Sequence, residues 1–490
     1  MSARSTSPPV EASRQRLRVN PSRILGAATT TGLVLLIAAA PWPIGSVQPW
    51  AFWLIVVLAW TLLAIRGLAL ISGSDARVSL PAPVGVAAVL LLAVLVWSAL
   101  QASIAAPAGW AHPIWAELPA DLPVSFPTVS LDPDRTIEAV CRLSAYLAIG
   151  VLAYLAARSA RRARRLLWAF LVVAALQAGL GLLREAAGIR ELFGYALNLG
   201  RASGSFVNPN HFAAYVNLAV VAAAVLLLDA LRAEADAPRL ATALARAARA
   251  MLERQVGLTL LLALLLMASL ASGSRGGFVS LVLASVILLL VRFGRGTLLL
   301  AVLGLLVALG AALLFTAGVP TLERLDELLP ASELEPGAGG RLAGFALAIE
   351  AWRQRPWSGH GLGAWPAVFH TLRDERFPLV QFDYVHNTWL ELLLELGAPA
   401  FAALLVAFAL LLFLCYRAAV QAREPLPAIG SGAAVLLGLH GLVDFPAQIP
   451  AVAASFAMIF GLAVGRAAVW FANRDRSRRS HRAAGSEDEL

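Results

Sequence analysis

Long apolar runs, separated by short polar segments, recur from one end of the chain to the other. Each run is close to the ~20 residues that an α-helix needs to cross a bilayer. The runs predicted as transmembrane helices are residues 24–40, 50–71, 81–102, 137–157, 166–183, 212–231, 256–271, 278–291, 297–316, 398–416, 428–442 and 451–471. The pattern therefore predicts an all-α polytopic membrane protein with about 12 transmembrane helices, rather than a string of soluble domains.

Arginine sets the expected orientation, because the chain contains no lysine. If the amino-terminal end is cytoplasmic, every Arg-rich segment between spans falls on the inner side, as the positive-inside rule requires. These segments are residues 16–23, 158–165, 232–254, 292–295, 417–423 and 474–479. Topology thus accounts for the net charge of +9, and no nucleic-acid partner is expected.

The same orientation predicts the organisation of the chain. The expected parts are a cytoplasmic arm (1–23), nine transmembrane helices (24–316), a long periplasmic loop with short helices (317–387), three further transmembrane helices (388–471) and a cytoplasmic tail (472–490). Both termini are then cytoplasmic. Within the long loop, residues 341–353 predict an amphipathic helix with Leu342, Phe345, Ile349 and Trp352 on one stripe.

The most informative stretch is residues 383–397, DYVHNTWLELLLELG, where the long loop becomes a helix. Asn387 and Thr388 are residue types that cap helix amino termini, and Glu391 and Glu395, four residues apart, share one helix face. His386 directly precedes this helix. Imidazole titrates near neutral pH, so a histidine held there is suited to general acid–base catalysis. The alternative is that His386 only caps the helix or hydrogen-bonds the loop.

Two arginines on the expected outer side are candidate anion ligands. Arg275 lies in the Gly/Ser-rich turn SGSRGG between two spans, where an ionisable residue suggests function. Arg341 follows two glycines and opens the loop helix, a position unfavourable for a cation unless an anion shares it. A guanidinium binds phosphate through two parallel hydrogen bonds. The alternatives are a snorkelling interfacial Arg275 and a solvated Arg341.

Two further segments carry polar residues at span ends. In GSFVNPNHF (204–212), Asn210 is a candidate helix cap and His211 follows it; a structural turn is the better interpretation here and substrate contact the second. His440 and Asp444 are four residues apart near the end of a predicted span and are expected to share a helix face, as a structural or catalytic pair.

A metal site is not expected. The set His360, His370, Asp383 and His386 matches no ligand spacing, and the two cysteines form no metal-binding pattern. No cofactor is predicted.

Taken together, the motifs resemble the O-antigen ligase and O-antigen polymerase superfamily of bacterial envelope glycosyltransferases. The matching pieces are GSFVNPNHF (204–212), SRGG (274–277), Gly340-Arg341, GHGLG (359–363), HNTWLELLLELG (386–397) and Asp444-Phe-Pro446. Each piece alone is weak, but their order on a twelve-span scaffold is much more specific. The likeness covers about residues 201–450.

The resemblance implies an inverting, metal-independent glycosyltransferase of the bacterial inner membrane, with its active site facing the periplasm. The implied donor is a glycan on undecaprenyl pyrophosphate, and the implied acceptor is lipid A-core or a second lipid-linked glycan. The resemblance assigns acceptor activation to His386 and pyrophosphate binding to Arg275 and Arg341. Asn210, His211, Asn387, Glu391, Glu395 and Asp444 are kept as possible supporting residues.

Other functions stay open. Ligases, polymerases and protein O-oligosaccharyltransferases share these motifs, so the branch is not fixed. A transporter or flippase of lipid-linked sugars would be expected to show ionisable residues at span centres and a repeat, whereas here the candidates gather at span ends. A scaffolding protein would not need the set His386, Arg275 and Arg341.

Overall fold

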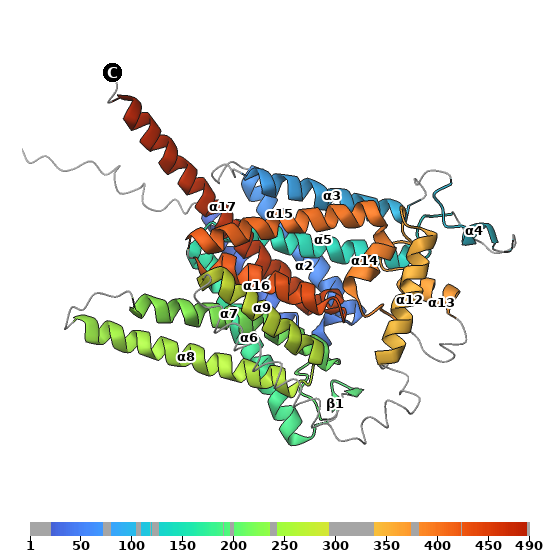
Figure 1. Cartoon of the computed structure of the whole chain (residues 1–490), viewed down its shortest axis with the longest axis horizontal. Helices are drawn as coiled ribbons and strands as arrows, with labels where there is room; N and C mark the ends of the chain where they lie inside the picture. Colours follow the sequence, from blue (N-terminus) through green and yellow to red (C-terminus); the bar gives the residue numbers. More distant parts are fainter. Residues whose placement is uncertain are drawn as a thin grey trace, which may run out of the picture.

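The structure is a computed structural model that describes residues 21–71, 80–103, 109–117, 119, 127–189, 191–196, 200–235, 243–293, 338–373, 382–422 and 424–487 (Figure 1). Within these residues the chain is a bundle of helices. The helices that match predicted spans are α1 (Pro21–Ala39), α2 (Pro49–Ile71), α3 (Ala82–Gln101), α5 (Pro133–Ala156), α6 (Ala160–Ala187), α7 (Pro209–Ala235), α8 (Ala243–Ala271), α9 (Arg275–Phe293), α15 (Ala398–Ala422), α16 (Pro425–His440) and α17 (Pro450–Glu487).

Shorter elements connect them. They are η2 (Ile44–Ser46), α4 (Ile114–Glu117), the two-residue strands β1 (Glu191–Leu192) and β2 (Tyr195–Ala196), α12 (Ala338–Gln354), α13 (Trp365–Leu372), α14 (Thr388–Leu396) and η4 (Pro446–Gln448). β1 and β2 pair antiparallel as a small hairpin between α6 and α7.

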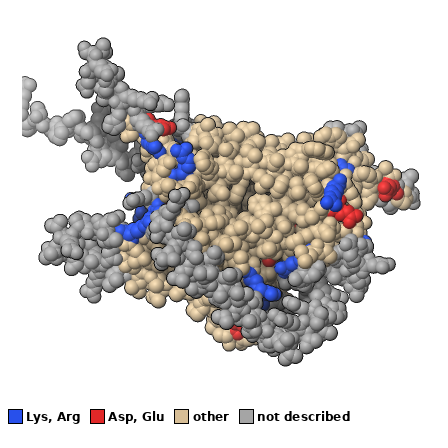
Figure 2. All heavy atoms as spheres, viewed as in Figure 1, with Lys and Arg blue, Asp and Glu red and all other residues tan. Residues whose placement is uncertain are grey.

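Seven helices of the described chain are long and apolar enough to cross a membrane, and α1, α8, α9 and α16 contribute shorter apolar stretches. The predicted span at residues 297–316 lies outside the described residues. On the face that Figure 2 shows, uncharged residues cover most of the middle of the described chain, and charged side chains gather towards the two ends of the long axis and in the lower part of the view. The all-α polytopic membrane architecture is therefore confirmed for the described residues.

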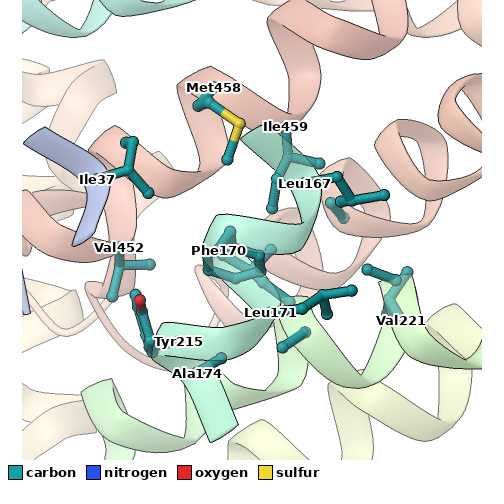
Figure 3. Packing of buried hydrophobic residues seen from close by; sticks show 14 of the residues in the cluster. Ile37, Leu167, Phe170, Leu171, Ala174, Tyr215, Val221, Val452, Met458 and Ile459 are labelled. Atoms are coloured by element: carbon teal, nitrogen blue, oxygen red, sulfur yellow. The ribbon is translucent and has the colours of Figure 1, made fainter. Parts of the chain in front are cut away.

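The interior of the bundle is built around α17 and α7, whose apolar stretches are mostly buried. Figure 3 shows Phe170 of α6 beside Tyr215 of α7; their ring centroids lie 5.4 Å apart in an edge-to-face arrangement. Small residues let α17 approach α5 closely. A Cβ atom on Gly465 would lie 2.6 Å from the backbone oxygen of Tyr154. Close backbone approach through small residues is how helices associate without a hydrophobic driving force in lipid.

The amphipathic helix predicted for residues 341–353 exists as α12, and its predicted stripe is right for Phe345 and Trp352, which pack against the core, but wrong for the other two residues. Leu342 and Ile349 are exposed, whereas Leu347, Ala348 and Ala351 are buried. The buried face packs against α13 and α14. Small alanines on this face allow the close contact, so size and not hydrophobicity selects the side that faces the protein.

The short helix α14 is fixed to the end of α16. The Thr388 backbone N–H donates to the Gly441 oxygen at 2.7 Å, and the indole Nε1 of Trp389 donates to the Gly438 oxygen at 2.8 Å. Gly397, with a φ of 77°, then turns the chain directly into α15. The loop before α14 is thereby held against the α16–α17 connection.

Candidate active site

His386 is placed with a strained backbone at the start of α14. Its φ is +61°, which non-glycine residues seldom adopt. The prediction that Asn387 caps this helix is confirmed, because its Oδ1 accepts the N–H groups of Trp389 and Leu390 at 3.1 and 3.0 Å. The preceding Val385 N–H donates to Oε2 of Glu391 at 2.8 Å. Hydrogen bonds on both sides of His386 thus maintain a conformation that costs free energy.

Asp444 faces His386 across a short gap. Its Oδ1 lies 3.6 Å from Nδ1 of His386 and 3.9 Å from Nε2 of His211, and it accepts the Phe445 N–H at 2.9 Å. Burial alone would raise the pKa of Asp444, but its interactions with the surrounding imidazoles outweigh this effect and hold that pKa well below its ordinary value. Asp444 is therefore an ionised, buried carboxylate.

The expected helical pair of His440 and Asp444 needs correction. α16 ends at His440, and a turn follows before Asp444, so the two residues do not share a helix face. The turn instead aims the carboxylate at His386 and His211, which come from two other parts of the chain. His440 remains within electrostatic range of the same carboxylate.

Three buried histidines surround this carboxylate with unused hydrogen-bonding capacity. Among the described residues, Nε2 of His211, Nδ1 of His386 and both ring nitrogens of His440 have no hydrogen-bond partner. The ring of Phe445 packs edge-on against His211 and His386, with centroids 4.6 and 4.9 Å apart. Most buried polar atoms in proteins are paired, so this cluster of orphaned nitrogens calls for a functional explanation.

The Gly/Ser turn before α9 contacts the same cluster. A Cβ atom on Gly276 would lie 2.8 Å from Cγ2 of Val443 and 3.7 Å from Nε2 of His440, so a side chain there would push the turn away. Arg275, the first residue of α9, is exposed beside this contact. Arg341, in the first turn of α12, lies within electrostatic range of His440. Arg341 thus lies close enough to His440 to affect the histidine cluster electrostatically, and Arg275 is the chain neighbour of a glycine that contacts His440.

Arg201 is a further arginine of this region that the motif analysis did not assign a role. Its Nε donates to the Ser272 oxygen at 2.8 Å, and its Nη2 donates to Oδ1 of Asn210 at 2.9 Å. It therefore connects the start of α7 to the turn that carries Arg275. Its position just before the GSFVNPNHF motif is the signal that could have identified it.

Asn210 does not cap α7 as predicted. The helix begins at Pro209, and Oδ1 of Asn208 accepts the Asn210 N–H at 2.7 Å, so the capping position belongs to Asn208. Proline suits the first helical position because it has no N–H to satisfy there. Asn210 is thereby available to accept from Arg201.

Glu391 and Glu395 lie on one buried face of α14, as predicted, and both hold loops. Glu391 accepts from the Val385 N–H and, at 3.2 Å, from Nε2 of Gln448. Glu395 accepts from the Trp365 N–H at 3.1 Å. Burial raises the pKa of Glu391 well above its ordinary value and that of Glu395 to about 7. These carboxyls position the histidine loop and the 359–365 loop.

Among the described residues, no group of three His, Cys, Asp or Glu side chains has an arrangement that could hold a metal ion. His360 instead faces His112, with Nδ1 and Nε2 3.2 Å apart, and its own Nε2 lies 2.8 Å from the Ala351 oxygen. It belongs to a loop contact.

Comparison with known proteins gives one family. A family model described as O-antigen ligase (Wzy_C) matches residues 260–405, which include Arg275, Arg341, His386 and both glutamates of α14. No curated protein matches the chain. The resemblance of the motifs to the O-antigen ligase and O-antigen polymerase superfamily is therefore confirmed for this segment, which is less than half of the chain.

Proposed function

We propose that this protein is an inverting, metal-independent glycosyltransferase that moves a glycan from undecaprenyl pyrophosphate to an acceptor hydroxyl. The reaction takes place on the periplasmic side of the bacterial inner membrane, with both termini cytoplasmic. The acceptor is lipid A-core in a ligase, or a second lipid-linked glycan in a polymerase.

The observation that carries this proposal is the pairing of the His386 imidazole with the ionised Asp444, in a cluster whose third histidine, His440, lies within electrostatic range of Arg341. A carboxylate 3.6 Å from Nδ1 favours a proton on that nitrogen and leaves Nε2 as the base. It also stabilises the imidazolium that forms during transfer. Glycosyl transfer from a pyrophosphate needs a base that deprotonates the acceptor hydroxyl. It also needs cations that stabilise the anionic leaving group.

In the proposed step, the acceptor oxygen forms a bond to the anomeric carbon as the bond from that carbon to the pyrophosphate oxygen breaks. His386 takes the acceptor proton, and undecaprenyl pyrophosphate leaves with the electron pair of the broken bond. Arg275 and Arg341 offset the negative charge that develops on the leaving group. A single displacement inverts the configuration of the anomeric carbon.

The test is a transfer assay with purified protein in liposomes containing undecaprenyl-pyrophosphate glycan and EDTA, with and without lipid A-core. Product that requires lipid A-core indicates a ligase, and a ladder from the donor alone indicates a polymerase. Transfer that survives EDTA with inverted product supports the proposal. Movement of the donor across the bilayer without any transfer would contradict it and favour a transporter, and transfer that needs a protein acceptor would place the chain in the protein-glycosylating branch.

A further inference from the structure

A cavity of about 250 Å³ lies beside the candidate active site without including His386, Arg275 or Arg341. It is enclosed by α3, α5, α14 and α15, together with the 362–366 loop and η4. In Figure 1 these helices lie on the α3–α5–α15 side of the bundle, whereas α9, which carries Arg275, lies on the other side of α16. The cavity is therefore separate from α9 and its Arg275.

One wall of the cavity is polar and has spare hydrogen-bonding capacity. Arg142 projects from α5, where it pairs with Glu138 and covers the Phe52 ring with its guanidinium carbon 4.1 Å from the ring centroid. Its Nε and the hydroxyl of Tyr146, one helical turn away, are buried and have no hydrogen-bond partner among the described residues. Both residues line the cavity, and buried polar atoms without a partner are rare in folded proteins, which makes this wall a candidate contact for a polar ligand.

The net charge of this wall is small. Arg142 is balanced by Glu138, and Glu391 and Glu395 keep their protons to higher pH than ordinary carboxyls because burial raises the pKa of each. A wall of this kind suits hydroxyl groups, which both donate and accept hydrogen bonds, better than it suits a pyrophosphate.

Much of the rest of the lining is apolar and adjoins the lipid. Leu143, Leu392 and Leu404 belong to it. α3 and α15, which contribute to this part of the lining, bury the smallest shares of their apolar stretches among the seven long spans of the described chain. A cavity with hydroxyl-binding groups on one side and lipid-facing leucines on the other matches an amphiphile with a sugar head and an alkyl tail.

Two aromatic side chains, Tyr384 and Phe445, separate this cavity from His386. Tyr384 lines the cavity and stacks on Phe445 with ring centroids 4.1 Å apart. Phe445 in turn packs edge-to-face against the His386 ring. In an inverting displacement the acceptor and the leaving group lie on opposite sides of the anomeric carbon. An acceptor that enters from the cavity approaches His386 across Tyr384 and Phe445.

We propose that the cavity between α3, α5, α14 and α15 is the acceptor site and binds a glycolipid, with its sugar hydroxyls on Arg142 and Tyr146 and its chain along Leu143 and Leu404. This proposal rests on the proposed glycosyl transfer. Lipid A-core and a lipid-linked glycan share the required chemistry, and the assay distinguishes them.

The decisive variant is Leu404→Trp, which fills the apolar part of the cavity from a helix that faces lipid. Its matched control is Val406→Trp, an exposed position on the same helix that does not line the cavity. In the liposome assay we expect Leu404→Trp to raise the acceptor KM by about tenfold, the scale of an overpacking penalty, with the donor KM unchanged. Val406→Trp should leave both constants unchanged. Whichever acceptor, lipid A-core or lipid-linked glycan, supports wild-type transfer should show the shift.

Tyr146→Phe gives a second test that preserves packing. Removal of one hydroxyl should raise the acceptor KM by about fivefold, equivalent to one hydrogen bond. An unchanged acceptor KM in both variants, or a change in the donor KM instead, would overturn the acceptor site while wild-type transfer still supports the enzyme. Absence of transfer by the wild-type protein with every acceptor would overturn the proposed function itself.

Discussion

Two groups of histidines in this protein differ in how their ring nitrogens are satisfied. In the loop contact of His112 and His360, the Ile114 N–H donates to Nδ1 of His112 at 3.4 Å, Nε2 of His112 meets Nδ1 of His360, and Nε2 of His360 meets the Ala351 oxygen. With one tautomer of each ring, every hydrogen bond in this series has both a donor and an acceptor. In the cluster of His211, His386 and His440, four ring nitrogens make no hydrogen bond among the described residues, and two of them face the Asp444 carboxylate at 3.6 and 3.9 Å.

The difference separates a structural use of histidine from a chemical one. Neutral imidazoles in a complete hydrogen-bond chain fasten loops, and they lose that function when a proton is added. Buried imidazoles with free nitrogens beside an ionised carboxylate can take up and release protons or bind a ligand. His360 is as buried as the three histidines of the cluster, so burial alone does not distinguish the two uses.

The largest contrast is expected from deleting one histidine of each group. His386→Ala should lower kcat by about 10²–10⁴-fold, the usual contribution of a positioned base, without loss of donor binding. His360→Ala should leave kcat nearly unchanged and lower thermal stability, because it leaves the Ala351 oxygen and His112 unpaired. Rates and melting temperatures of the two purified variants check this. Equal losses of kcat in the two variants would show that the two groups of histidines do not differ in function.

A smaller effect should follow from replacing the guanidinium of Arg275 by an ammonium group. Arg275→Lys keeps the charge and removes the two-pronged phosphate geometry, so the donor KM should rise by about tenfold. Arg353→Lys, at an exposed position on α12, is the matched control and should have no effect. Initial rates over a range of donor concentrations measure both, and an unchanged donor KM in Arg275→Lys would show that this arginine does not bind pyrophosphate.

The carboxyl face of α14 should respond to pH in the opposite way from an ordinary carboxylate. Burial raises the pKa of Glu395 from 4.5 to about 7, so the folded protein retains a proton that the unfolded chain releases. The stability that comes from this proton is complete below pH 4.5 and is lost as the pH rises to about 7. Glu395→Gln cannot titrate at this position. Between pH 5 and 8 we expect its melting temperature to fall by about 2–4 °C less than that of the wild-type protein. Parallel curves for the two proteins would contradict the shifted pKa.

The smallest effect is expected at the loop contact. Burial lowers the pKa of His112 to about 3 and that of His360 to about 4, so the neutral rings are favoured by the fold. The corresponding stability is present above pH 6.5 and is lost as the pH falls towards 4. Hydrogen exchange at Ile114 and Trp115, corrected for the intrinsic rate, should accelerate a few-fold over that range. His112→Asn cannot titrate and should show no such pH dependence at these amides; acceleration in both proteins would exclude the histidine pair as its cause.

The helical framework could be predicted from the sequence because a bilayer imposes one length and one composition on every span. The face of α12 could not, because hydrophobicity does not reveal which residues a neighbouring helix contacts. Leu342 is large and apolar but exposed, while Ala348 and Ala351 are buried because a close neighbour leaves no room for more.

The parts of the candidate site that depend only on neighbouring residues in the sequence could be predicted. His386 and its cap Asn387 are examples, since loop and helix signals coincide there. Arg142 and Tyr146 escaped notice because nothing local to α5 indicates that a cavity adjoins them. The pairing of Asp444 with His386 joins segments 58 residues apart in the chain and depends on the turn after α16, whose direction the sequence does not specify.

The central claim, that the His386 imidazole moves the acceptor proton, is tested most directly by chemical rescue. His386→Ala protein in liposomes would be supplied with donor, acceptor and increasing imidazole, and the initial rate of transfer measured. We expect the rate to rise with the concentration of neutral imidazole, while Arg275→Lys gains nothing. A His386→Ala protein that transfers at the wild-type rate without imidazole, or that binds donor but never recovers with it, would contradict the claim.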